Sequence, residues 1–217
     1  QNFIEVWKKA NFAQYTFNSL FICFFSTLGA VLLSSLTAFC IERCDFPGRK
    51  FVKNLYLMTM FIALGAVTLR PLYTLAVNVG IQNSLWPIIL ITIGAQGSNV
   101  FLVSKFIAGL PKELDEAAMI DGASKWQMFW KVRLPQLKTP MALSAIIVAL
   151  SNLNNLTVPL TLTGGGPGKA TTVISILAYR ESFSYYHFGE ASAMSIVLCL
   201  INFVLTVMYV KAVKYEL

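Results

Sequence analysis

Long uncharged stretches alternate along the chain with short segments that carry its charged side chains. A helix needs about 20 mostly apolar residues to cross the hydrocarbon core of a bilayer. Five stretches meet or approach this length and predict membrane spans at about 17–40, 51–69, 85–103, 141–160 and 191–210. The pattern therefore predicts an all-α fold, a polytopic transmembrane helix bundle with five spans in this chain.

The distribution of Lys and Arg predicts the orientation of these spans. Twelve of the 17 cationic residues fall on the side of the loops 41–53 and 104–139 and of the tail 211–217, and five fall on the other side. Loops rich in Lys and Arg stay in the cytoplasm. We therefore expect a multi-pass protein of the cell inner membrane with a cytoplasmic carboxyl terminus. Because the first residue then lies outside, we also expect one further span before Gln1, which makes six in the intact subunit.

Composition narrows the class of protein. Of the 217 residues, 56% are hydrophobic and 12% are charged, and the net charge is +7. Soluble domains carry about 25% charged residues. These values exclude a disordered chain, a nucleic-acid-binding domain and an ordinary cytosolic enzyme, and they make membrane lipid the expected surroundings.

Candidate chemistry on the chain is sparse. The four cysteines lie within or at the end of apolar runs, with no further Cys pair or His nearby, so neither a disulfide framework nor a metal site is predicted. His187 has no carboxylate partner at useful spacing. Because no catalytic set of side chains occurs in one place, we predict that the chain is not an enzyme and carries no cofactor.

The cytoplasmic segment 104–139 is amphipathic and carries the most specific pattern. Pro111 suits the first turn of a helix, and acidic residues follow it where the positive end of the helix dipole favours them. Leu134-Pro135 predicts the end of the run, since the residue before a proline usually leaves helical geometry. From the residues alone, the alternative is a short helix lying on the bilayer surface.

Several positions of this segment stand in one fixed pattern. In order they are Glu116-Ala117-Ala118, Gly122, Val132 and Leu134-Pro135. The pattern resembles the EAA loop of the membrane subunits of ABC importers, with Val132 where isoleucine is usual. The resemblance implies a coupling helix that docks into a cleft of an ATP-hydrolysing subunit, with Glu116 paired to a basic residue and Gly122 permitting a turn and close contact. The coupling residues that it implies are Glu116, Ala117, Ala118, Asp121, Gly122, Leu134 and Pro135.

Polar side chains gather near the outer end of the fourth predicted span. Ser151, Asn152 and Asn155 lie there, and the two asparagines are three residues apart, which predicts that they share one helix face. Polar groups are costly in a bilayer, so they face a partner or a water-filled cavity. Their amides could bond sugar hydroxyls together or could bond across helices, and the residues alone leave these alternatives open.

A second resemblance favours the interpretation that these amides bond sugar hydroxyls. The runs 152–155 and 162–167 resemble those of MalF-type subunits of carbohydrate importers. That likeness implies that Asn152 and Asn155 contact the sugar. The opposite wall of the pathway would come from the span before the EAA loop, with Gln96, Ser98 and Asn99. Departures from the maltose pattern occur at Ile91, Ala95 and Ser98, so maltose itself is not indicated, and 85–103 is more similar to a MalG-type half.

A glycine-rich run, Gly164-Gly165-Gly166-Pro167-Gly168-Lys169, superficially suggests a phosphate-binding loop. Thr163 and Ala170 break the required G-x-x-x-x-G-K-[ST] spacing, and the run is predicted to face outward, away from ATP. A turn-rich external loop is the better interpretation. The family resemblance implies that this loop faces a solute-binding protein, which makes Gly164, Gly165, Gly166 and Pro167 docking candidates.

Taken with the resemblance, these features predict one ABC transporter transmembrane domain over 1–217, of the type I importer fold. The implied assembly contains a second permease subunit, two ATPase subunits that hold ATP and Mg, an extracytoplasmic solute-binding protein and a sugar or oligosaccharide. The alternative is a secondary transporter driven by an ion gradient. It would need ionisable residues in the spans, and the predicted spans at 17–40, 85–103, 141–160 and 191–210 contain none.

Overall fold

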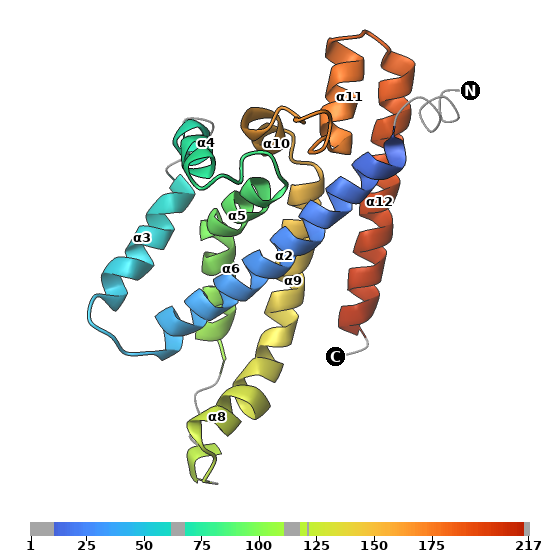
Figure 1. The fold of residues 1–217 in the computed structure, drawn as a ribbon. Helices are drawn as coiled ribbons and strands as arrows, with labels where there is room; N and C mark the ends of the chain where they lie inside the picture. Colours follow the sequence, from blue (N-terminus) through green and yellow to red (C-terminus); the bar gives the residue numbers. More distant parts are fainter. Residues whose placement is uncertain (1–10, 62–67, 111–117, 121, 215–217) are drawn as a thin grey trace. The chain divides into compact units, whose positions relative to one another are not determined.

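The computed structural model describes residues 11–61, 68–110, 118–120 and 122–214, and the regular elements found there are helical (Figure 1). The all-α class is therefore confirmed. The elements are α2 (Phe12–Arg43), α3 (Arg49–Phe61), α4 (Leu69–Asn78), α5 (Trp86–Gly94), α6 (Gly97–Ala108), α8 (Lys125–Met128), the π-helical turn η2 (Phe129–Arg133), α9 (Leu134–Leu153), α10 (Thr157–Leu162), α11 (Ile174–Phe183) and α12 (Phe188–Lys214).

Three of the described helices are long and apolar enough to cross a membrane: Phe12–Arg43, Trp126–Leu153 and Phe188–Lys211. The pair Trp86–Gly94 and Gly97–Ala108 makes a fourth if it is counted as one interrupted span. The crossing predicted at 51–69 includes 62–67, which lie outside the described residues. A total of five spans stays a prediction.

Two predicted spans are interrupted, which the sequence pattern did not indicate. The helix at 85–103 breaks between α5 and α6, where Ala95 has ψ 52° and Gln96 has φ −114°. The helix at 141–160 ends at Leu153 and resumes as α10 at Thr157. In this second gap the side chain of Asn155 accepts a hydrogen bond from the Val158 N–H, so a side chain replaces the helical backbone partner.

Pro135 does not end a helix, contrary to the sequence prediction. Lys125 to Leu153 is helical throughout, and a π turn, Phe129–Arg133, stands directly before Leu134 and Pro135. Proline removes one backbone donor and crowds the carbonyl four residues earlier. A turn with wider hydrogen-bond spacing is one of the recognised ways in which a helix accommodates such an irregularity.

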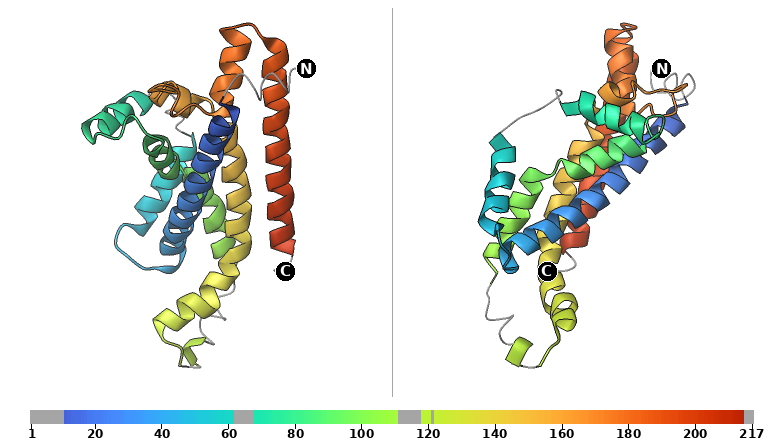
Figure 2. Two further views of the ribbon diagram at one scale, coloured as in Figure 1. Left: turned by 45° about the vertical axis from the view of Figure 1, so that its right-hand side comes forward. Right: turned by 60° about the vertical axis from the view of Figure 1, so that its left-hand side comes forward.

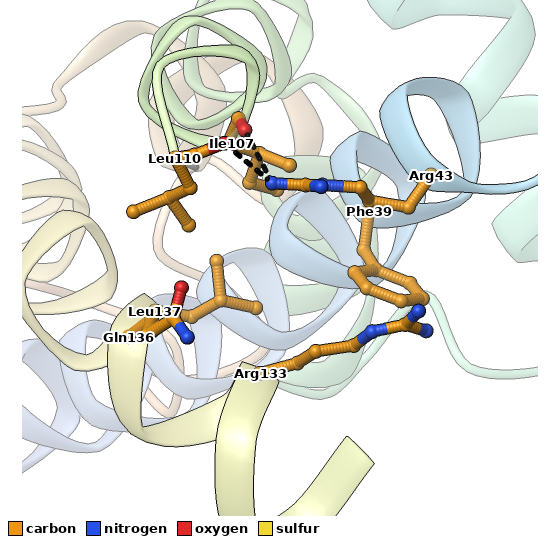
Figure 3. Close-up of a pocket in the computed structure, with 7 residues that line it drawn as sticks. All are labelled: Phe39, Arg43, Ile107, Leu110, Arg133, Gln136 and Leu137. Carbon is orange, nitrogen blue, oxygen red and sulfur yellow. Dashed lines mark hydrogen bonds between the residues drawn. The ribbon is translucent and has the colours of Figure 1, made fainter. Parts of the chain in front are cut away.

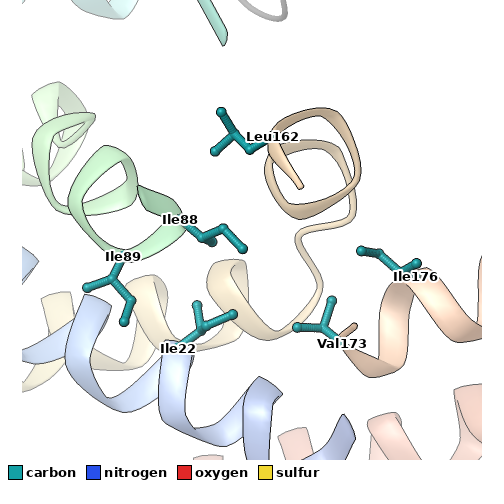
Figure 4. Packing of buried hydrophobic residues seen from close by; sticks show 6 residues of the cluster. All are labelled: Ile22, Ile88, Ile89, Leu162, Val173 and Ile176. Atoms are coloured by element: carbon teal, nitrogen blue, oxygen red, sulfur yellow. The ribbon is translucent and has the colours of Figure 1, made fainter. Parts of the chain in front are cut away.

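The chain divides into two compact units. The first comprises Gln1–Ala30, Leu64–Ala95 and Ile147–Leu217. Its main apolar cluster joins α2, α5, α10 and α11 through six buried side chains, which Figure 4 shows: Ile22, Ile88, Ile89, Leu162, Val173 and Ile176. In the same unit α11 and α12 lie side by side as an antiparallel pair (Figures 1 and 2).

The second unit comprises Val31–Ala63 and Gln96–Ile146. Its core is formed by Ala38, Ile41, Val100, Val103, Ile107 and Leu137, which come from α2, α6 and α9. Helix α3 packs against α6 in this unit. Gly97 permits the approach, because a Cβ atom there would lie 2.3 Å from Thr59 Oγ1.

Candidate functional site

The described part of the EAA-like segment contains a tight turn between two helical pieces. Residues 118–120 are helical, and Gly122 follows with φ +75°. The Gly122 N–H donates to Met119 O at 3.1 Å, and the Ala123 N–H donates to Ala118 O at 3.0 Å. This pair of bonds is the Schellman arrangement that ends a helix with a left-handed residue. The positive φ at 122 therefore favours glycine over residues with a Cβ atom.

The next helix begins only two residues later with a capping box. The backbone N–H of Ser124 donates to Gln127 Oε1 at 2.9 Å, and the Gln127 N–H donates to Ser124 Oγ at 3.2 Å. These reciprocal bonds satisfy two amide groups that a helix start leaves unpaired. Stop and start signals together fix the turn at 122–124.

Large apolar side chains around this turn are exposed. Ile120 is 86% exposed, Trp126 71% and Met119 58%. The ring centroids of Trp126 and Trp130 lie 5.6 Å apart in an edge-on arrangement. We call these four residues the coupling patch. An exposed cluster of large apolar side chains marks a surface that contacts a partner or a membrane.

The structure describes only some of the other residues that were predicted to couple the chain to an ATPase. Ala118 is half-buried and supplies a carbonyl to the turn at Gly122. Leu134 and Pro135 lie in the first turn of α9. Three lie outside the described residues: Glu116, Ala117 and Asp121.

The predicted substrate residues of the first unit lie at the end of α9 and beyond it. Asn152 is half-buried in α9, and its Nδ2 has no hydrogen-bond partner among the described residues. Asn155 lies in the gap after α9, where its carbonyl accepts a bond from Ser175 Oγ at 3.1 Å. Because the helix ends at Leu153, the prediction that Asn152 and Asn155 share one helix face is wrong. Ser151 is exposed in the last turn of α9.

One polar residue near these side chains was not predicted. Asn202 of α12 donates from Nδ2 to Asn154 Oδ1 at 3.2 Å. It is the one amide side chain in the uncharged run 191–210. That isolation was the sequence signal that could have found it, since a lone amide in such a run needs a polar partner.

The predicted opposite wall belongs to the second unit. Asn99 is buried in α6, and its Nδ2 donates to Oε1 of Gln96. Ser98 is exposed. Because the two groups lie in different units, their facing one another across a pathway stays a prediction.

The predicted docking loop is held by side-chain bonds to its carbonyls. Thr172 Oγ1 donates to Gly165 O at 3.0 Å, Thr171 Oγ1 donates to Gly166 O at 2.6 Å, and the Arg180 guanidinium donates to Gly164 O. Gly165 has φ +81°, and a Cβ atom there would lie 2.7 Å from Thr172 Oγ1. The glycine run therefore forms a fixed turn, with Pro167 exposed beside it.

His187 does have a carboxylate partner, contrary to the sequence prediction. Its Nδ1 lies 2.9 Å from Glu181 Oε2, across the turn that joins α11 to α12. Ligand atoms of Glu181, His187 and Glu190 all lie within 4.8 Å of one another. Residues six apart are not neighbours within a helix or along a strand, and the turn that brings these two together is irregular, which is why the pair was missed.

Several long apolar helices, together with helix interruptions at which the amide side chains of Gln96 and Asn155 lie, are typical of a polytopic membrane protein. Its sequence also identifies the family to which it belongs. The chain belongs to the family of binding-protein-dependent transport system inner membrane components, whose sequence profile matches residues 15–214.

Individual relatives agree with this assignment. The diacetylchitobiose uptake system permease protein NgcG of Streptomyces coelicolor is 31% identical over 165 residues, which cover 75% of this chain and 54% of that protein. The galactooligosaccharides transport system permease protein GanQ of Bacillus subtilis is 35% identical over 150 residues, which cover 69% of this chain and 50% of that protein. The chain thus spans about half the length of these relatives.

A solved structure shares the fold. The likeness to a chain of a bacterial alginate ABC transporter, solved in complex with an alginate pentasaccharide-bound periplasmic protein, has a TM-score of 0.77 at 21% identity. It covers 96% of this chain and 80% of that one. At this identity the likeness shows the fold, which is that of an ABC transporter permease.

Proposed function

We propose that this chain forms the membrane pathway of an ATP-driven importer and couples it to ATPase subunits through residues 104–139. The observation that carries the proposal is the turn at Gly122, which exposes the coupling patch. Trp and Met are enriched in the cores of protein interfaces, and Trp is prominent among the residues that dominate binding energy.

The partners follow from this role. Two ATPase subunits, each holding ATP and Mg, would receive the coupling segments of this chain and of a second permease subunit. Glu116 and Asp121 would contribute acidic contacts beside the coupling patch, and Ala117 would allow close approach. Hydrolysis belongs to the ATPases, so this chain supplies no chemistry and binds no cofactor. The orientation from the Lys and Arg distribution puts the carboxyl terminus on the same cytoplasmic side.

The proposed cargo is a sugar or oligosaccharide delivered by a solute-binding protein. Two relatives carry oligosaccharide names. Asn152 offers a buried amide nitrogen without a partner among the described residues, and such a group is suited to a ligand hydroxyl. Ser151, Asn155, Gln96, Ser98 and Asn99 complete the proposed pathway. The fixed turn at Gly164–Pro167 is the proposed docking site of the binding protein.

The experiment is a purification of the full-length tagged protein from native membranes in mild detergent, with mass spectrometry of what accompanies it. We expect an ATPase with Walker motifs and a second permease subunit. Ile120→Glu should reduce recovery of the ATPase, since it puts a charge into the proposed interface. The matched control is Leu75→Glu, at a side chain in α4 that is 60% exposed. Recovery of the chain alone, or equal ATPase recovery with Ile120→Glu, would contradict the proposal.

A further inference from the structure

An arginine at the end of α2 contacts the chain just before residues 111–132, the part of 104–139 that we call the coupling segment. Arg43 Nη2 donates to Leu110 O at 2.9 Å and to Ile107 O at 3.3 Å (Figure 3). Ile107 lies in the last turn of α6, where its carbonyl also accepts the Leu110 N–H at 3.2 Å, and Leu110 follows the helix. The helix dipole is negative at this end. The guanidinium makes charge-assisted bonds to both carbonyls. The residues immediately after Leu110 enter the coupling segment.

A second arginine holds the chain where it leaves that segment. Arg133, the last residue of the π turn, places its guanidinium carbon 5.3 Å from the centre of the Phe39 ring (Figure 3). This is the distance of a cation–π contact. Leu137, one helical turn further on, packs into the cluster that contains Ala38 and Ile41.

Both contacts end on one stretch of α2. Phe39 and Arg43 are four residues apart on one helix, so they lie on the same face. The pocket that they line also contains Ile107, Leu110, Arg133 and Leu137. The chain thus contacts the same turn of the 32-residue helix α2 both where it enters the coupling segment and where it leaves it.

We propose that Arg43 and Arg133 are positioning residues that transmit movement of the coupling segment to α2. The inference rests on the proposed function of residues 104–139. A loop attached to α2 at one end could swing about that point when an ATPase pulls on it. Attachment at both ends removes that freedom, so displacement of the loop must move the end of α2. A helix hydrogen-bonded along its length then carries the displacement into the membrane.

Arg49 provides the matched control. Its guanidinium donates to Glu42 O at 2.8 Å and to Ile41 O, and it pairs with Asp45 at 2.9 Å. These partners belong to the end of α2 and the turn after it, and none belongs to the coupling segment. Loss of Arg49 therefore weakens the same helix end without releasing the loop.

The test follows α2 with the exposed native thiol Cys40, which lies between Phe39 and Arg43. In the Cys44→Ser, Cys199→Ser background, the assembled complex is labelled with a maleimide in lipid vesicles, with and without trapping by ATP, Mg and vanadate. We expect trapping to change the labelling rate by roughly 5-fold, the low end of usual coupling between sites. Arg43→Gln and Arg133→Gln should each reduce this ratio toward one with the ATPase still bound. Arg43→Lys should retain part of it, and Arg49→Gln should keep it.

The outcomes separate this inference from the proposed function. Absence of an ATPase from the purified wild-type complex would overturn both. With the ATPase present, the inference alone fails in any of three cases: trapping leaves the wild-type rate unchanged, the Arg43→Gln and Arg133→Gln variants keep the wild-type ratio, or Arg49→Gln loses the ratio to the same extent.

Discussion

Asn18 and Thr172 are 154 residues apart in sequence, and the Asn18 Nδ2 group donates to the Thr172 carbonyl at 3.0 Å. The same nitrogen donates to Ala170 O at 2.8 Å. Asn18 is 5% exposed. One buried amide of α2 thus satisfies two carbonyls of the chain that follows the glycine run, and the nearby Ser19 hydroxyl accepts a bond from the Ile174 N–H at 3.0 Å. The chain after the glycine run is thus fixed to α2.

Asn18→Asp should destabilise the protein although the shape is nearly unchanged. A carboxylate cannot donate, so both carbonyls lose their partner and face a negative charge, at a cost of about 1–3 kcal/mol in the free energy of unfolding. Thermal unfolding in detergent checks this. The control is Asn83→Asp, at an exposed position. Equal stability of the two variants would contradict the role given to Asn18.

Gly122→Ala should weaken ATPase binding through the backbone alone. A Cβ atom at 122 meets no described atom within 4 Å, but φ is +75° and the left-handed region costs an L-residue about 1–2 kcal/mol. We expect an affinity loss of about tenfold, and a smaller loss for Gly122→Asn, since asparagine tolerates this conformation. Gly109→Ala is the control, with φ −82° and ordinary contacts beyond 3.4 Å. The order Gly, Asn, Ala in measured affinity is the checkable result.

The capping box should behave as a coupled pair. Ser124→Ala and Gln127→Ala each remove one of its two reciprocal bonds, and loss of such a cap costs about 1 kcal/mol of helix stability. Hydrogen exchange of the backbone amides of 124–128 should rise in either variant. The double variant should cost less than the sum of the singles, because each cap orients the other. Strict additivity would show two independent contacts.

Replacement of Gly29 by a larger residue should be tolerated only if Ile93 is replaced by a smaller one. A Cβ atom at 29 would lie 2.4 Å from Ile93 Cδ1 and 2.9 Å from its Cγ1. Gly29→Val is therefore expected to cost about 1–3 kcal/mol through overpacking. Ile93→Ala in the same chain should restore much of that loss, measured by unfolding in detergent. A double variant no more stable than Gly29→Val would place the strain elsewhere.

Asn152→Leu should reduce transport without reducing the stability of the protein. The variant removes a buried donor that has no partner among the described residues, so stability should stay equal or rise by up to about 1–3 kcal/mol. Uptake of labelled oligosaccharides should fall. Asn155→Leu should instead destabilise the protein, because its side chain accepts the bond that begins α10. Unchanged uptake with Asn152→Leu would remove this residue from the pathway.

Hydropathy predicted the long helices but not where apolar helices are interrupted. The run 17–40 lies inside α2, and 191–210 lies inside α12. The breaks after Gly94 and Leu153 fall within uncharged runs, where hydropathy gives no signal. The first break lies beside the close approach of Gly97 to Thr59, and the second is accompanied by a local side-chain bond from Asn155.

The coupling turn was partly readable in the sequence. Gly122 was expected to permit a turn, and its φ of +75° is the left-handed conformation of a residue that ends a helix. The spacing Ser124-x-x-Gln127 is a recognised helix start that could have located α8. The two arginine contacts could not be predicted, since Arg43 and Leu110 are 67 residues apart. Roles in sugar contact and ATPase docking stay predictions.

The π turn at Phe129–Arg133 changes how side chains are arranged around the whole helical stretch 125–153. Each of its hydrogen bonds encloses one residue more than an α-helical bond, and one residue corresponds to about 100° of rotation. Side chains before the turn, such as Trp126, are therefore out of phase with those after it, such as Leu137. A single helical wheel drawn through 126–153 would assign one half of the helix to the wrong face. Removal of one residue from 129–133 would realign the two halves and rotate the coupling patch about the helix axis.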